Sequence, residues 1–261
     1  GCYGIKPAAG RIPRAQEHAP AWGVFSTPGP LARTVRDAAR YLDATAGPHP
    51  NDLDALDSTG HGFEAAVLAT PPRLKRIAYS PDLGYAVVDP EVVNVTRAAA
   101  AALAGALGAE LVEAGPGFPD PMEWWLSIAA SGDTRMVDAM TPEERSRLEP
   151  GFARFAEVGR EITAVQIAES LEWRHQVNRM MTEFFEQYDL LLTPATATTA
   201  FIAEGPPPQE IAGRTVGPSG FIPFTYPFNF TGHPSASMPA GLSASGVPVG
   251  VQAVLARFAA A

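Results

Sequence analysis

Residues 76–113 read RIAYSPDLGYAVVDPEVVNVTRAAAAALAGALGAELVE, and this stretch decides the fold class. Residues 76–80 predict a short strand. Asp89-Pro90 predicts the start of a helix that ends near Gly108, because proline is favoured at the first helical position and glycine just after the last. Residues 111–113 predict a second strand. A strand, a helix and a strand at this spacing predict a βαβ unit on a mostly parallel sheet.

Helical signals surround this unit on both sides. Thr34 with Asp37 three residues later predicts a helix N-terminus, and Gly47-Pro48 predicts its end. Residues 121–187 are predicted to be mostly helical. Leu190 to Leu192 predict a buried strand by their length and flanking residues. The other expectations are helix starts at Thr141 and Thr163, extended segments at 236–238 and 249–254, and loops over 1–30, 48–62 and 194–234. The fold class expected is α/β, an α/β/α sandwich around a mixed, mostly parallel sheet.

Composition excludes several classes of protein. Lys plus Arg number 19 and Asp plus Glu number 28 in 261 residues, a net charge of −9. Such a chain is poorly suited to bind nucleic acid, which needs clustered cations. No stretch approaches the ~18 apolar residues that a membrane span requires. A single cysteine, Cys2, excludes an internal disulfide framework and predicts a reducing, cytoplasmic compartment.

The residues by themselves predict no metal site and no complete catalytic site. The histidines are scattered, without the close pairs that bind zinc. The acids at 52, 54 and 57 crowd one loop but do not follow the calcium-loop pattern, so a solvated loop is the better interpretation. There is no GxSxG motif. The serines after His233 are interpreted as structural. The five histidines are His18, His49, His61, His175 and His233.

Five segments, in order along the whole chain, together resemble the amidase signature family. Each is weak alone, but five in the family's order are specific. The segments are Gly1 to Pro7 with Gly10-Arg11 (G-x-x-G-[LI]-K-P-x-x-G-R), Gly29 to Ala39 (G-P-[LM]-A-R-[TS]-V-x-D-A-A), Tyr188 to Pro194 (Y-D-[VL]-L-[LV]-x-P), Phe228 to Gly241 (F-N-x-[TS]-G-x-P-x-x-S-x-P-x-G) and Gly246 to Gln252 (G-x-P-[VI]-G-x-Q).

The resemblance implies an amide-bond hydrolase that uses a Ser–cis-Ser–Lys arrangement, acyl-enzyme chemistry and no cofactor. In that family the catalytic residues precede the K-P segment, which here begins at residue 1. We therefore expect residues 1–261 to be the C-terminal portion of a single amidase-signature domain, with no separate second domain. No catalytic residue is expected in this chain, and the chain alone is expected to be inactive. Lys6 matches the K-P lysine, for which a structural or surface role is expected.

The part implied for this chain is pocket wall and sheet, around a small-molecule amide substrate. One alternative is the A subunit of glutamyl-tRNA(Gln) amidotransferase. Ile222 stands where those subunits tend to carry an acid, which weighs against it. A second alternative is a truncated or degenerate member without activity, and a homodimer remains open. The pocket candidates are Trp124, Trp125, Phe221, Phe224, Tyr226 and Asn229.

Overall fold

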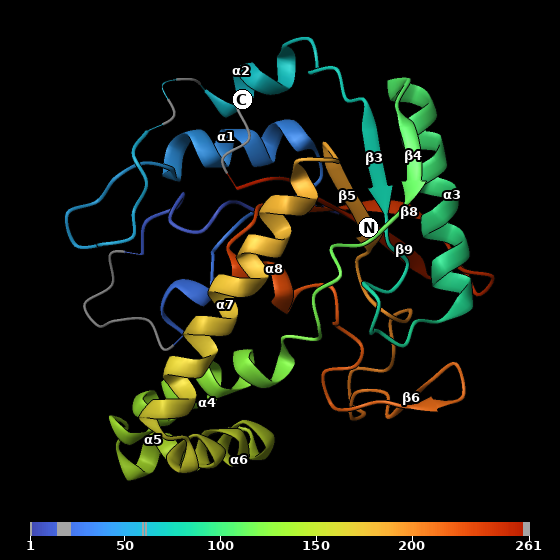
Figure 1. Cartoon of the computed structure of the whole chain (residues 1–261). Helices are drawn as coiled ribbons and strands as arrows, with labels where there is room; N and C mark the ends of the chain where they lie inside the picture. The colour runs from blue at the N-terminus through green and yellow to red at the C-terminus, as the bar shows by residue number, and fades with distance from the viewer. Residues whose placement is uncertain (1, 15–21, 59, 61, 258–261) are drawn as a thin grey trace.

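One mixed β-sheet forms the centre of the chain. Residues 2–14, 22–58, 60 and 62–257 are described, in a computed structural model (Figure 1). The strands are β1 (Tyr3–Lys6), β2 (Leu31–Ala32), β3 (Arg76–Tyr79), β4 (Glu110–Glu113), β5 (Leu190–Pro194), β8 (Ser235–Leu242) and β9 (Pro248–Val254). Their order across the sheet is β2-β1-β8-β9-β5-β3-β4. Two further short strands, β6 (Glu210–Ile211) and β7 (Arg214–Thr215), form a separate ribbon.

Helices cover both faces of this sheet. Figure 1 shows α3 alongside β4, and the long α7 on the opposite side with α4, α5 and α6 gathered near its N-terminal end. Within the described residues, no helix has the length and apolar content that crossing a bilayer demands. The helices are α1 (Val35–Thr45), α2 (Phe63–Leu68), α3 (Pro90–Leu107), α4 (Met122–Asp138), α5 (Pro142–Ser146), α6 (Pro150–Val158), α7 (Ala164–Phe185) and α8 (Tyr226–Thr231), with 3₁₀ turns η1 (Gly23–Phe25) and η2 (Gly159–Glu161).

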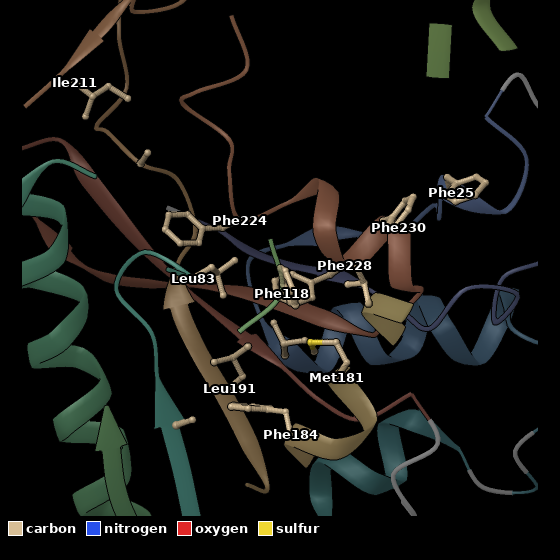
Figure 2. Close-up of a cluster of buried hydrophobic side chains, with 14 residues drawn as sticks. Phe25, Leu83, Phe118, Met181, Phe184, Leu191, Ile211, Phe224, Phe228 and Phe230 are labelled. Atoms are coloured by element: carbon tan, nitrogen blue, oxygen red, sulfur yellow. The ribbon is translucent and has the colours of Figure 1, made fainter. Parts of the chain in front are cut away.

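The alternation of side chains along β5 creates two cores. Successive residues of a strand point to opposite faces. Leu191 joins the cluster with Met181 and Phe184 of α7, which Figure 2 shows close together. Leu190 and Leu192 join the cluster on the α3 side. Because β5 is buried on both faces, it reads as the continuous apolar run noted in the sequence. The expected α/β/α layering is confirmed.

Local capping signals place the helix ends where the sequence predicts them. The Thr34 side chain accepts the Asp37 backbone N–H, and Asp89 accepts from Glu91 in the same way. Thr141 and Thr163 each form a complete capping box. Gly108 follows α3 with φ of 64°, the left-handed conformation typical of a helix end. These helices are therefore specified by short-range hydrogen bonds as well as by packing.

The expectation of a mostly parallel sheet needs correction. Among the six strand pairings of the described sheet, only β3 with β4 and β3 with β5 are parallel. The other four are antiparallel. For β8 with β9 the short hairpin connection allows no other direction. This hairpin lies between β1 and β5 and pairs antiparallel with both. The βαβ unit of residues 76–113 is present as predicted, but it forms one edge of the sheet.

Three strands and one α-helix fall in segments expected to be loops. β1 lies within residues 1–30, and α8 and the β6–β7 ribbon lie within 194–234. β1 has no strong strand signal of its own, since its four residues include Gly4 and Lys6. It forms because β2 and β8 supply hydrogen bonds on both sides. Tertiary pairing outweighs local preference here.

Truncation of Leu191 tests the two-sided burial of β5. Leu191 is 0% exposed, whereas Leu53 is 99% exposed. We expect Leu191→Ala to lower the free energy of unfolding by about 2–5 kcal/mol through lost burial and a residual cavity. The control Leu53→Ala should change it by less than about 0.5 kcal/mol. Urea denaturation measures both, and equal effects would contradict the assignment of the core.

Candidate functional site

A cavity of about 410 Å³ lies beside the N-terminal end of α4. Its walls come from residues 85–87 after β3, from Asp120 and the first turns of α4, and from residues 215–220, Pro223 and Tyr226 at the start of α8. Most wall residues are apolar or glycine, with a few polar groups among them. This volume and this mixture are typical of sites for small molecules.

Two tyrosine hydroxyls and one carboxylate meet in the wall of this cavity. The Tyr226 hydroxyl donates to Asp120 Oδ1 over 2.7 Å, and the Met122 backbone N–H donates to the same oxygen over 2.9 Å. The Tyr85 hydroxyl donates to the Pro223 carbonyl over 2.9 Å. Burial is the main factor that raises the pKa of Tyr85 and of Tyr226. Both hydroxyls therefore stay protonated and act as donors at neutral pH.

The central strands hold the loop that precedes α8. Gln252 of β9 donates from Nε2 to the Phe224 carbonyl over 2.8 Å and to Thr193 Oγ1 of β5 over 3.1 Å. Phe224 is itself fully buried. The amide of Gln252 thus fixes the backbone two residues before Tyr226. The cavity wall is positioned by the sheet centre rather than by the loop alone.

Lys6 fixes the other end of α8. Its ammonium donates to the His233 carbonyl over 2.6 Å and to the Pro7 carbonyl over 3.2 Å. Burial, with a smaller contribution from the charge of Arg257, lowers the pKa of Lys6 to about 7. These contacts agree with the structural role expected for Lys6 from the sequence.

Two further contacts complete the end of α8. Arg174 of α7 donates from Nε to the Phe230 carbonyl over 2.8 Å, and the Ala9 N–H donates to the Gly232 carbonyl over 3.1 Å. Gly232 has φ of +76°, and a Cβ there would lie 3.1 Å from the Ala9 side chain. Only glycine adopts this conformation without strain. The carbonyls that a helix end leaves unpaired are thus bound by groups from β1, its following turn and α7.

The pocket candidates from the sequence divide into two groups. Tyr226 lines the cavity, and the Trp125 ring lies 6.0 Å from it, between centroids. Trp124 instead stacks on Trp173 of α7 at 4.1 Å. Phe221 packs edge-on against Phe201 at 5.3 Å, Phe224 is buried in the core, and Asn229 is half-buried on α8. The structure therefore brings Trp125 and Tyr226 together, and substrate contact by any of the six stays a prediction.

Sequence reasoning missed Tyr85, Asp120 and the loop at 215–220. Asp120 lies between two prolines directly before a helix, which is a local signal for a fixed carboxylate. Nothing in the sequence connects it with Tyr226, since 106 positions separate the two. Their meeting is a consequence of the tertiary fold.

Two smaller hollows are also present in the described part of the chain. One, of about 290 Å³, lies at the carboxyl ends of β3 and β4 around Ser80 and Gly115. The other, of about 260 Å³, is apolar and lies between β1, α1 and α2. The apolar hollow has no carboxylate in its described lining. The hollow around Ser80 contains the carboxylates of Asp82 and Glu113, but it is smaller and has fewer apolar wall residues than the larger cavity. The larger cavity is therefore the candidate binding site.

The described residues contain no group of three or more acids, histidines or cysteines placed to hold a metal ion. His18 and His61, considered in the sequence, lie outside the described residues. In the cavity, the described lining includes Ser219 but no lysine, arginine or histidine that would activate it as a nucleophile. The arrangement can bind and orient a small molecule, and bond cleavage needs groups from elsewhere.

Comparison with known proteins identifies the class. A family model described as Amidase matches residues 1–259, so the chain belongs to the amidase family. It is 31% identical over 256 residues to an acylamidase from Rhodococcus erythropolis, covering 97% of this chain and 53% of that protein. It is also 31% identical over 290 residues to the A subunit of a glutamyl-tRNA(Gln) amidotransferase from Synechococcus sp. (strain CC9605), covering 97% of this chain and 55% of that subunit.

A solved structure is similar over the same extent. The crystal structure of a bacterial aryl acylamidase of the amidase signature family superposes with a TM-score of 0.85 at 29% identity, covering 99% of this chain and 55% of that one. The chain spans about half the length of the curated relatives it matches. The family and the α/β fold expected from the sequence motifs are confirmed.

Replacement of Lys6 tests the anchoring of α8. Lys6→Met leaves the His233 carbonyl without its donor, so we expect the free energy of unfolding to fall by about 1–3 kcal/mol at pH 6. Lys75 is the chain's other lysine and is exposed. Lys75→Met should change stability by less than about 0.5 kcal/mol.

The same variants test the lowered pKa of Lys6 through the pH dependence of stability. Because the pKa of Lys6 is lowered in the folded chain, the unfolded chain holds this proton more tightly. The free energy of unfolding should then rise from about pH 7 towards pH 10, by at most about 1.4 kcal/mol per pH unit. Lys6→Met should lack this rise and Lys75→Met should keep it. Denaturant titrations at several pH values measure it, and parallel profiles in all three proteins would refute the assignment.

Proposed function

We propose that the protein to which this chain belongs hydrolyses the amide bond of a small, largely apolar acyl amide. The observation that carries the proposal is the 410 Å³ cavity with Tyr226 and Asp120 in its wall, found in a chain of the amidase family. The acylamidase relatives support an acyl amide as the substrate class. The family's serine nucleophile and lysine would lie outside this chain, with a serine ester as the intermediate.

We further propose that the chain is the C-terminal part of one amidase domain, with no second domain within it. The sheet supports this, because strands from both ends of the chain, β1 and β9, belong to it. Relatives that are nearly twice as long support it as well. Exposed apolar side chains at the β2 edge, Leu31 at 79% and Val35 at 44%, would suit contact with the remaining part. The chain by itself should then bind amides without turnover.

An amidotransferase of the glutamyl-tRNA(Gln) class is the second candidate, favoured by the identity to a subunit of that kind. Such a protein would take the amide of an amino acid, which carries a carboxylate. Ile222 and the absence of a lysine, arginine or histidine from the described cavity lining favour the acylamidase instead. A catalytically inactive member is the third candidate, and only an assay separates it from the first. We also propose a cytoplasmic location, supported by the single cysteine, and leave a homodimer to be measured.

Hydrolysis of an acyl anilide tests the proposed function. The complete protein should release 4-nitroaniline from 4′-nitroacetanilide, and the 261-residue chain alone should not. Tyr226→Phe removes the hydroxyl that donates to Asp120, so we expect KM to rise about 3- to 10-fold with a smaller change in kcat, since the typical net contribution of one hydrogen bond is about 0.5–1.5 kcal/mol.

Tyr41→Phe is the matched control, because Tyr41 is 42% exposed on α1 and lies outside the cavity lining. It should leave both constants unchanged. Hydrolysis of glutamine with no anilide turnover would transfer the assignment to the amidotransferase class. If the complete protein turns over neither substrate, the third candidate, a catalytically inactive family member, is supported.

A further inference from the structure

The charge of the candidate cavity is one-sided. Asp120 is the only Asp or Glu in the described lining, and that lining contains no lysine, arginine or histidine. Asp120 is exposed, and its Oδ1 accepts from both Tyr226 and Met122. With the described residues, its Oδ2 forms no hydrogen bond or ion pair. One carboxylate oxygen is therefore left for a ligand.

The apolar walls around the Asp120 carboxylate strengthen the electrostatic effect of its charge on a ligand. Val87, Met122, Leu126, Val216 and Pro218 contribute apolar surface to the same cavity. A charge beside apolar walls is screened less than one in open water. An anionic ligand would lose hydration and meet repulsion there, whereas an ammonium group would gain a charge-assisted hydrogen bond.

The two tyrosine hydroxyls do not offset the preference of the cavity for a positively charged ligand. Tyr226 already donates to Asp120, and Tyr85 already donates to the Pro223 carbonyl. Both protons are thus committed within the protein, and the oxygens that remain are acceptors. The lining also contains the hydroxyls of Thr215 and Ser219, which are uncharged, so Asp120 is the one charged side chain that a ligand meets in the described lining.

We propose that Asp120 is a specificity-determining residue and that the cavity selects amides with an apolar body and a positively charged amine, against amides that bear a carboxylate. This inference rests on the proposed function for its link to an amide substrate, but the binding preference is measurable without turnover.

Three probes of nearly equal shape test the preference in the complete protein: 3-phenylpropylamine, 3-phenylpropanol and 3-phenylpropionate. Their dissociation constants are measured by ligand-observed NMR at pH 7 and low salt. We expect the amine to bind about 3- to 5-fold more tightly than the alcohol, as for a partly exposed ion pair, and the carboxylate to bind at least about 3-fold more weakly than the alcohol.

Asp120→Asn keeps Oδ1 for Tyr226 and Met122 but removes the charge, so the amine and the alcohol should then bind within about 1.5-fold of each other. Glu169→Gln, on an exposed position of α7 outside the cavity lining, removes the same charge from the molecule and should keep the preference. If Asp120→Asn does not fold, salt replaces it: in wild type, about 1 M NaCl should abolish the amine preference and leave alcohol binding unchanged.

The outcomes separate the two proposals. Equal binding of amine and alcohol by wild type, or an unchanged preference in Asp120→Asn, would overturn the role of Asp120 whether or not anilides are hydrolysed. A preference that Asp120→Asn removes, in a protein that hydrolyses no amide, would support the role of Asp120 and overturn the proposed function.

Discussion

The hydrogen bond from the Lys6 ammonium to the His233 carbonyl joins the two ends of the described chain. Its 2.6 Å length connects β1, near the start, with the turn that leads from α8 into β8. At the other end of α8, Tyr226 reaches Asp120, and through it the first turn of α4. The position of the cavity wall thus depends on how firmly α8 is held. Lys6 is an anchor in this fold, since its partners are backbone carbonyls rather than a serine hydroxyl.

Elements with local signals could be predicted from the sequence, whereas β1, which lacks such a signal, could not. The helix from Asp89 to Gly108 combines a cap, a first-turn proline and a terminal glycine, so its bounds follow from sequence alone. β1 offers four residues that become a strand only between β2 and β8. The excess of antiparallel pairing also escaped prediction, although the short connection between β8 and β9 required it there.

The residues of the candidate site were likewise predicted only in part from the sequence. Tyr226 was found because it precedes a family motif, and Trp125 lies next to it. Asp120 and Tyr85 were missed because their partners are 106 and 138 positions away, and no periodicity connects such distant residues. Aromatic character alone was a poor guide, since Trp124 and Phe221 pack against other rings instead. The pair of polar side chains that gives the cavity its chemistry became visible only in the fold.

The central claim is that the cavity beside α4 is where this protein holds its amide. Photoaffinity labelling of the complete protein with a diazirine-bearing acyl anilide, followed by peptide mass spectrometry, tests it most directly. The label should fall on the cavity-lining residues within 85–87, 120–126 or 215–226 and should be lost with excess unlabelled anilide. Competable labelling around Ser80 and Gly115, in the hollow at the ends of β3 and β4, with none at those three segments would contradict it.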